Sequence, residues 1–177
     1  MPKEINGKKL RLLISSSKIA HKVEQLGKQI TQDYKNKDLL IIAILKGSIV
    51  FLADLIRHID LQVEIDFVGV SSYKNEMKPG EIELIAEPRL EINGRDVLLV
   101  EDLEDSGGTL SFIRDYILKI EPSSLKICTL VKKRKERNTN VNSDYSGFVI
   151  DDEFIVGYGM DFVDQGRNLP DIYVIES

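Results

Sequence analysis

The chain has 177 residues, 42% of them hydrophobic, with a formal net charge of −5 and one cysteine, which suits a single domain with a sizeable core. The negative charge argues against a general nucleic-acid or membrane-surface binder, because such proteins need a positive field, and no apolar run approaches the ~20 residues that span a bilayer. Because Cys128 is the single cysteine, no intramolecular disulfide forms, and a reducing cytoplasm is the simplest compartment. Cys128 lies in an apolar run that is typical of a buried strand. We expect no signal peptide.

The first predicted unit is a strand followed by a helix. Leu10 to Ile14 predicts a short apolar strand, and the serines at 15–17 offer N-caps for the helix. Apolar residues then recur from Ile19 to Ile30 at spacings of four, three and four, which predicts an amphipathic helix ending near Tyr34.

A second strand and helix follow, with a lysine at the turn between them. The apolar run 39–45 predicts a strand buried on both faces, and 49–59 predicts an apolar helix. Two interpretations of the turn at Lys46, Gly47 and Ser48 stay open. Either Lys46 and the helix N–H groups face a phosphate, or the turn is an ordinary one with a solvated lysine.

The next segments predict a strand, a long loop and an extended return. Residues 61–70 alternate in part between apolar and polar, as strands do. Residues 71–81 are polar and long for a connection, which fits a lid or binding loop as well as a hairpin tip. Residues 81–92 are predicted to be extended, and Asn93-Gly94 signals a tight turn.

The central stretch, VLLVEDLEDSGGTL over 97–110, combines an apolar strand with a glycine-containing turn. In an open α/β sheet, ligands bind beyond the carboxyl ends of the strands. The backbone N–H groups of Ser106 to Thr109, near a helix start, suit a phosphate monoester. The stretch matches neither a Walker A loop nor a GxGxxG dinucleotide loop.

Acidic residues crowd the end of this strand. The pair Glu101 and Asp102 suits vicinal sugar hydroxyls or magnesium, because hard cations favour carboxylate oxygens, and Asp105 lies where a general base could act. Glu104 alternates away from Asp105, so we expect its side chain to point to solvent. The competing interpretation is that these acids merely cap the following helix.

The remainder predicts a helix over 110–120, a strand over 125–131, a basic run over 132–137 and short late strands near 148–150, 154–158 and 172–175. The basic run is either a solvated loop or the source of a base-contacting lysine. Strands that alternate with helices predict an α/β fold with a mainly parallel central sheet, and the late strands suggest a small appended lobe.

The central stretch resembles the 5-phosphoribosyl-1-diphosphate (PRPP) binding motif of type I phosphoribosyltransferases. The turn at 45–48, the segment Ser71-Ser72-Tyr73, Leu130-Val131-Lys132, the FIVGYGMD run and Arg167-Asn168-Leu169-Pro170 extend the resemblance from about residue 14 to 177. The combination is similar to the bacterial hypoxanthine (hypoxanthine-guanine) branch of the family. It implies one domain over 1–177, with a central twisted sheet flanked by helices and a purine-side hood from about 1–15 and 145–177.

Two positions depart from the family pattern. Glu104 stands where the family usually has an apolar residue, and Gly108 stands where it often has a larger one. Gly108 is expected to loosen the loop without removing an N–H donor. Neither departure removes a motif residue.

The activity that the resemblance implies is transfer of the 5-phosphoribosyl group from PRPP to N9 of hypoxanthine, and of guanine, in purine salvage. Pyrophosphate is released, and inosine or guanosine monophosphate (IMP or GMP) forms. The implied cofactor is Mg²⁺, the implied assembly is a homodimer or homotetramer, and neither a nucleic acid nor a membrane is an expected partner.

The resemblance also implies residue roles. The ribose-phosphate of PRPP is assigned to Glu101, Asp102, Asp105, Ser106, Gly107, Gly108 and Thr109. Pyrophosphate is assigned to Lys46, Gly47 and Arg167, with a non-proline cis peptide before Lys46. The flexible loop over the site begins at Ser72 and Tyr73. The purine is assigned to Lys132, which would donate to its 6-oxo group, and to Phe154, Ile155 and Asp161. Magnesium is assigned to Glu101, Asp102 and Asp161, and Asp105 is the candidate general base at purine N7.

Two alternatives remain open at this stage. A xanthine-guanine or adenine phosphoribosyltransferase would share most of these motifs, although Lys132 and the FIVGYGMD run disfavour adenine. A nucleotide-sensing regulator that binds RNA or a protein would need a broad basic face, and the net charge of −5 disfavours it.

Overall fold

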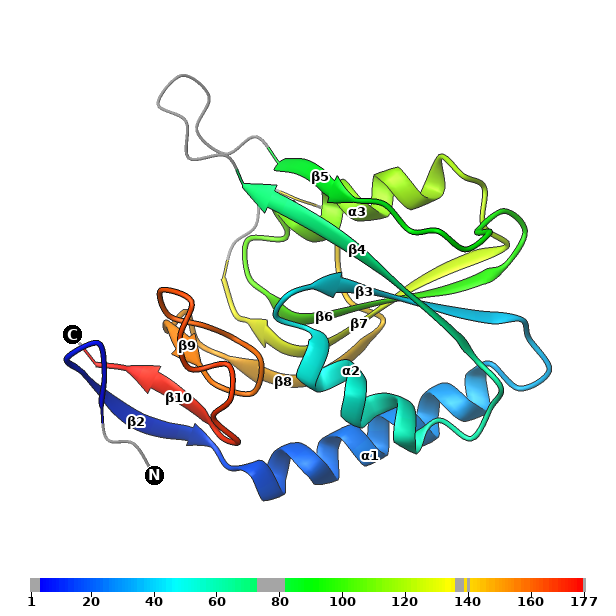
Figure 1. Cartoon of the computed structure of the whole chain (residues 1–177). Coiled ribbons are helices and arrows are strands. Elements are labelled where there is room, and N and C mark those ends of the chain that lie inside the picture. The colour runs from blue at the N-terminus through cyan, green and yellow to red at the C-terminus, as the bar shows by residue number, and fades with distance from the viewer. Residues whose placement is uncertain (1–3, 73–81, 136–138, 140, 177) are drawn as a thin grey trace.

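A six-stranded sheet forms the centre of the fold (Figure 1) in this computed structural model, which describes residues 4–72, 82–135, 139 and 141–176. The strand order is β5-β4-β3-β6-β7-β8, with every neighbouring pair parallel except β4 and β5. The strands are β3 (Leu39–Leu45), β4 (Glu64–Ser72), β5 (Ile82–Ala86), β6 (Asp96–Glu104), β7 (Ser124–Lys133) and β8 (Tyr145–Ile150). The predicted α/β class with a mainly parallel sheet is confirmed.

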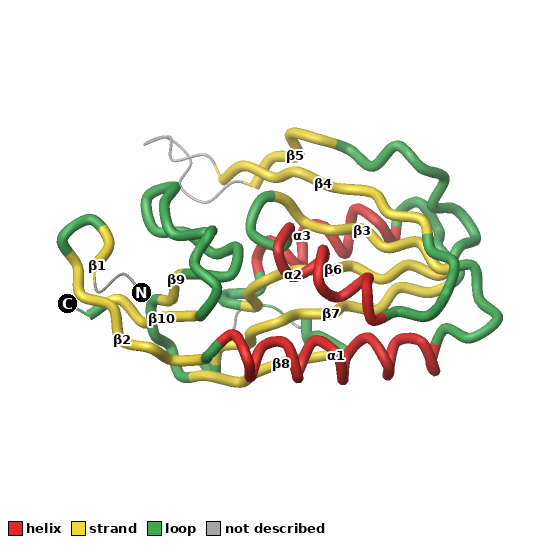
Figure 2. Tube along the Cα trace, turned by 60° about the horizontal axis from the view of Figure 1, so that its bottom comes forward, coloured by secondary structure: helices red, strands yellow, loops and turns green. Residues whose placement is uncertain are grey.

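Helices cover both faces of this sheet (Figure 2). On one face lie α1 (Ser16–Asp33) and α2 (Ile49–Leu55), which continues as a 3₁₀ turn, η1 (Ile56–His58), and on the other lies α3 (Gly108–Leu118). Successive side chains of a strand point to opposite faces, so Ile41 packs in the core under α1 and α2, whereas Leu40 and Ile42 pack with α3. None of the described helices has the length and apolar character needed to cross a membrane.

A second, antiparallel sheet forms a small lobe, in which the last strand of the chain pairs with an early one (Figure 1). Its order is β1-β2-β10-β9. The strands are β1 (Glu4–Ile5), β2 (Lys8–Ile14), β9 (Ile155–Val156) and β10 (Ile172–Ile175). The segment Tyr145–Ile150, which the sequence suggested as part of this lobe, pairs with β7 as the last strand of the main sheet.

The central strand is longer than its apolar run. β6 continues through Glu101 and Asp102 to Glu104 and pairs with β7 over this extension, where Glu101 lies opposite Thr129 and Glu104 opposite Lys132. The acids are therefore part of the sheet, and strand alternation decides which way each side chain points.

The start of α1 is capped from the far end of the chain. The serines at 15–17 were predicted to cap it, but the Ser15 side chain makes no cap hydrogen bond and instead contacts the Ser17 hydroxyl. The Ser16 N–H donates to Asp171 Oδ1 at 2.6 Å, and the Tyr173 hydroxyl donates to Asp171 Oδ2 at 2.9 Å. The Ser16 N–H is the largest cause that lowers the pKa of Asp171, and Tyr173 adds to it. The cap thus joins the last strand to the first helix.

Replacing Asp171 by alanine removes this cap, and we expect the free energy of unfolding to fall by about 1–2 kcal/mol. Because the folded chain lowers the pKa of Asp171, the carboxylate stabilises the fold fully above its ordinary pKa of about 3.9 and loses this effect as the pH falls through the folded value. Urea unfolding of both proteins between neutral and acidic pH measures the difference.

Ser15→Ala is the matched control, because the Ser15 hydroxyl caps nothing, and we expect a change within about 0.5 kcal/mol. Equal losses in the two variants, or a loss for Asp171→Ala that grows on acidification, would contradict this account.

Candidate active site

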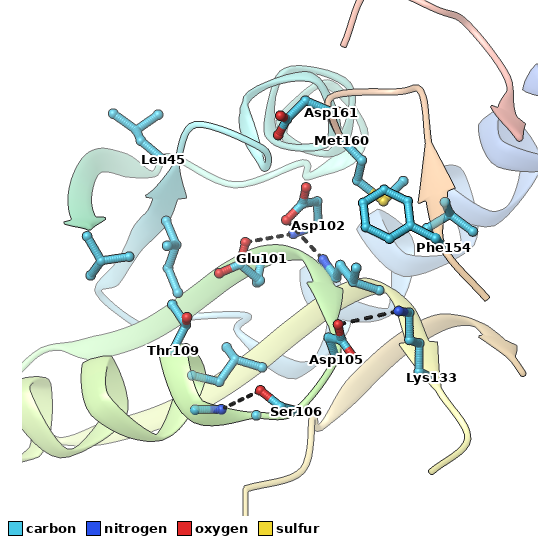
Figure 3. Close-up of a pocket in the computed structure, with 17 residues that line it drawn as sticks. Leu45, Glu101, Asp102, Asp105, Ser106, Thr109, Lys133, Phe154, Met160 and Asp161 are labelled. Atoms are coloured by element: carbon cyan, nitrogen blue, oxygen red, sulfur yellow. Dashed lines mark hydrogen bonds and ion pairs between the residues drawn. The ribbon is translucent and has the colours of Figure 1, made fainter. Parts of the chain in front are cut away.

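A cavity of about 370 Å³ lies where the carboxyl ends of β3 and β6 meet the small lobe (Figure 3). Most of the residues predicted for the site line it together: Glu101, Asp102, Asp105, Ser106, Gly107, Gly108, Thr109, Phe154, Ile155 and Asp161. Residues to which the sequence assigned no role complete the lining, among them Val70, Lys133 and Met160. The cavity therefore joins a polar half from the main sheet to a partly apolar half from the lobe.

The turn after β6 presents backbone N–H groups at the start of α3. Gly107 adopts a left-handed conformation with φ of +81° as the N-cap residue, a conformation that side chains with a Cβ disfavour. The Gly107 carbonyl accepts from the Ser111 N–H at 2.8 Å, and the Ser106 hydroxyl lies 3.5 Å from the Gly108 nitrogen. The first-turn N–H groups of a helix lack helical acceptors, so this turn is suited to a phosphate.

The acid pair lies beside this turn with little access to solvent. Glu101 and Asp102 are each 8% exposed, and within the described ranges no lysine or arginine forms an ion pair with either. Burial raises the pKa of Glu101 well above its ordinary value, and the neighbouring Asp102 charge raises it further. A pair of carboxylates held this way favours a bound cation or hydroxyl donors.

The turn after β3 packs directly against Asp102. A Cβ on Gly47 would lie 2.0 Å from Asp102 Oδ2, and a Cβ on Gly159 would lie 2.1 Å from the Gly47 carbonyl oxygen. The Leu45–Lys46 peptide is cis, as the resemblance implied. Only residues without side chains at 47 and 159 allow the acid pair, this turn and the lobe to touch.

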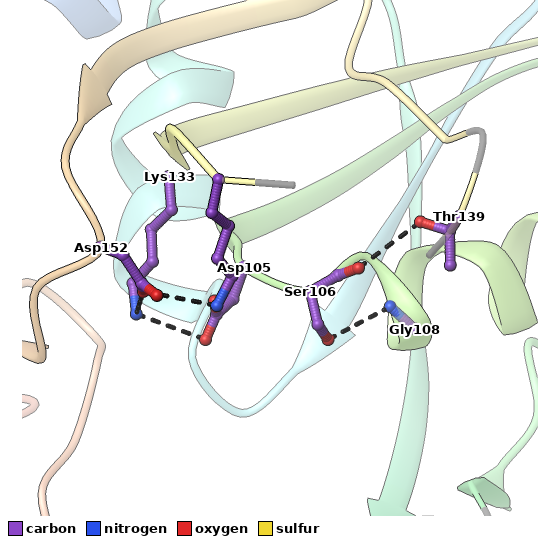
Figure 4. Close-up of polar contacts among 7 residues, drawn as sticks. Asp105, Ser106, Gly108, Lys133, Thr139 and Asp152 are labelled. Atoms are coloured by element: carbon purple, nitrogen blue, oxygen red, sulfur yellow. Dashed lines mark hydrogen bonds and ion pairs between the residues drawn. The ribbon is translucent and has the colours of Figure 1, made fainter. Parts of the chain in front are cut away.

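Asp105 belongs to a group of four alternating charges (Figure 4). Its Oδ2 lies 3.3 Å from Lys133 Nζ, its Oδ1 pairs with Lys135, and both lysines lie 3.3 Å from Asp152 Oδ1. The hydrogen bond to Asp105 is the largest cause that raises the pKa of Lys135. The Asp105 carboxylate is thus held beside two ammonium groups.

Lys132, the lysine expected to contact the purine, does not line the cavity. Its neighbour Lys133 lies there instead. Glu104 and Lys132 are directly paired on adjacent parallel strands and therefore share one face of the sheet. Lys132 Nζ lies 3.3 Å from Glu104 Oε1, whereas Lys133 and Asp105 face the cavity. The expectation that Glu104 points to solvent is wrong, because its side chain is 0% exposed.

The lobe contributes an aromatic face and an ion pair. Phe154 is 56% exposed and meets Phe162 edge-on at a centroid distance of 5.6 Å. Asp161 Oδ1 lies 2.6 Å from Arg167 Nη2, and Arg167 Nη1 donates to the Gly159 carbonyl at 2.8 Å. Because the Phe154 side chain is half exposed and lines the cavity, its ring is accessible to a planar ligand there.

Other predicted residues lie beside the cavity or cannot be placed. Lys46 is exposed, and neither Lys46 nor Arg167 lines the cavity. Ser72 is the last residue of β4, and Tyr73 lies outside the described residues. The residues that sequence reasoning missed, Lys133, Lys135, Asp152 and Gly159, come from segments already singled out. The signal for Lys133 is the strand register, which a single sequence does not display.

Comparisons with known proteins agree on one family. Residues 14–163 match the model of the phosphoribosyl transferase domain. The chain is 42% identical over 176 residues to a hypoxanthine-guanine phosphoribosyltransferase of Aquifex aeolicus, covering 98% of this chain and 99% of that protein. The Bacillus subtilis enzyme of the same name is 41% identical over 94% of this chain and 93% of its own length.

A solved structure agrees as well. The crystal structure of a hypoxanthine-guanine phosphoribosyltransferase from Bacillus anthracis superposes with a TM-score of 0.88 at 43% identity, covering 95% of this chain and 99% of that one.

We expect Gly47→Ala to lower the free energy of unfolding by about 1–3 kcal/mol, because the new methyl group overlaps the Asp102 carboxylate and forces a shift. Gly108→Ala is the matched control in the neighbouring turn. A Cβ there meets only Ile82 and Ser106 side-chain atoms at 3.7 Å, and Gly108 is the first residue of α3, so alanine should stabilise by a few tenths to about 1 kcal/mol. Urea unfolding measures both, and equal effects of the two substitutions would contradict the packing described here.

Proposed function

The chain belongs to the phosphoribosyl transferase family, and on this premise we propose that it transfers the 5-phosphoribosyl group of PRPP to N9 of hypoxanthine and of guanine. The bond from the anomeric carbon to pyrophosphate breaks, a bond from that carbon to N9 forms, and IMP or GMP is released with pyrophosphate. The proposal is carried by one observation, a cavity with two different halves. The turn from Ser106 to Thr109 (the phosphate turn) and the acid pair Glu101 and Asp102 line one half, and the exposed ring of Phe154 and Lys133 line the other.

The main-sheet half of the cavity is proposed to hold PRPP. The N–H groups of the turn from Ser106 to Thr109 bind the 5′-phosphate, with the Ser106 and Thr109 hydroxyls. Glu101 and Asp102 bind the ribose hydroxyls, and their charge stabilises the positive character that develops at the anomeric carbon. Pyrophosphate is assigned to the turn at Lys46 and Gly47 and to Arg167.

The acid pair fits a magnesium ion. Magnesium is commonly bound by one or two carboxylates together with substrate oxygens, which Glu101 and Asp102 supply from one side of the cavity and Asp161 from the lobe. When bound, Mg²⁺ would neutralise charge on PRPP and assist departure of pyrophosphate.

The lobe half is proposed to hold the purine. Phe154 stacks on the base, the Ile155 backbone meets its edge, and Asp105 accepts the proton from N7 as N9 forms the new bond. Lys133, buried at the cavity wall, takes the role that the sequence assigned to Lys132 and donates to the 6-oxo group. A donor there favours oxopurines, because the 6-amino group of adenine is also a donor.

The proposal extends to closure, assembly and location. Ser72 ends a strand at the cavity edge of the sheet, which supports a loop from Ser72 and Tyr73 that closes over the site and excludes water. The family resemblance supports a homodimer or homotetramer, and the single cysteine supports a cytoplasmic enzyme.

The test of this function is a panel of four bases with saturating PRPP and Mg²⁺. We expect hypoxanthine and guanine to yield pyrophosphate and the nucleotide, and adenine to show a kcat/KM at least about 100-fold lower, because a hydrogen-bonding site rejects a mismatched partner strongly. Chromatography of the nucleotides gives the rates. Absence of turnover with hypoxanthine, guanine and xanthine would refute the proposal.

Asp105→Asn is the control for catalysis within this panel. It keeps the turn geometry and removes the base, so kcat should fall by about 100-fold or more while the KM for PRPP changes little. An unchanged kcat would remove Asp105 from the role of base.

The assignment of the purine lysine is tested by two neighbouring substitutions. Lys133→Met should raise the KM for hypoxanthine by about 10- to 100-fold, the effect of losing one hydrogen bond from a charged donor. Lys132→Met, which removes the same charge one residue earlier, should leave that KM within about twofold. Steady-state rates at varied hypoxanthine and saturating PRPP decide between them, and the opposite ranking would return the role to Lys132.

A further inference from the structure

A buried carboxylate stands at the end of the strand that leads into the phosphate turn. Glu104 ends β6, two residues before Ser106, and its side chain is 0% exposed. The Ser143 N–H and hydroxyl donate to Glu104 Oε2 at 3.2 and 2.5 Å. An ionised carboxylate that is fully buried needs hydrogen bonds and a nearby cation.

Lys132 supplies such a cation from the neighbouring strand. Its Nζ lies 3.3 Å from Glu104 Oε1 and donates to Asn142 Oδ1 at 3.1 Å, and its side chain is 25% exposed. The segment after β7, which contains Asn142, also contacts the phosphate turn. The Thr139 hydroxyl lies 3.5 Å from the Ser106 carbonyl oxygen. Glu104 and Lys132 thus form an ion pair at the strand ends that lead into the phosphate turn.

We propose that Lys132 is a positioning residue for PRPP, because its positive charge offsets the negative charge of Glu104 and so preserves the affinity of the Ser106–Thr109 turn for a dianionic phosphate. A charge buried at this depth is poorly screened by solvent and acts over several ångströms. Glu104 with less compensation would repel the 5′-phosphate. This inference rests on the proposed function, since it assigns the phosphate to that turn.

The electrostatic role predicts opposite effects for the two members of the pair. Lys132→Met leaves negative charge behind the turn and should weaken binding of ribose 5-phosphate about tenfold. Glu104→Gln keeps hydrogen-bonding capacity toward Ser143 and leaves positive charge, so binding should be tighter than in the wild type. The double variant should return to within about twofold of the wild type, because the pair is coupled.

Titration calorimetry with ribose 5-phosphate, which needs no turnover, measures these affinities. Arg134→Met is the matched control, because it removes one positive charge two residues after Lys132. The Arg134 side chain is 70% exposed, so the effect on binding should be within about twofold. Thermal melts identify any variant that does not fold, and the Glu104→Gln result still decides if Lys132→Met is lost in this way.

Weaker binding in both single variants, or unchanged binding in both, would overturn the inference, as would a wild-type chain that does not bind ribose 5-phosphate. A wild-type chain that binds the probe but transfers phosphoribose to no purine would refute the proposed function alone. If the chain turns over hypoxanthine but Lys132→Met and Glu104→Gln change ribose 5-phosphate binding in the same direction, this inference alone is refuted.

Discussion

The parallel pairing of β6 with β3 on one side and β7 on the other is the constraint on which the site depends. Parallel strands end at the same edge of a sheet, so the turn at Lys46, the phosphate turn and the lysines at the end of β7 lie close together. Both faces of β6 are buried by helices, which leaves this edge as the place where its carboxylates can meet a ligand. The register with β7 then decides which lysine accompanies which acid.

Contiguous features of the site could be predicted from the sequence, and features set by long-range contacts could not. The phosphate turn and the pair Glu101 and Asp102 lie in one segment, so their composition and order suffice. The purine contact was predicted for Lys132 rather than Lys133, because a shift of one residue along a strand moves a side chain to the opposite face of the sheet. Glu104 was expected in solvent because its partners, Lys132 and Ser143, come from other segments.

The same reasoning applies to the fold. The strands and helices of the main sheet follow from apolar periodicity, which is a local signal. The cap of α1 does not, because the acceptor is Asp171, 155 positions after Ser16. Serines near a helix start are strong local candidates for caps, and a buried carboxylate from a distant strand displaced them here.

The interleaving of the small sheet bears on the order in which the protein is made. β10 lies between β2 and β9, so neither of these strands has its main partner until β10, the last strand in chain order, has been synthesised. The main sheet, by contrast, is complete once β8 is synthesised, and domains form progressively during translation. The half of the cavity that carries Glu101 and Asp102 can therefore form before the half that carries Phe154, which is completed only once β10 has been made.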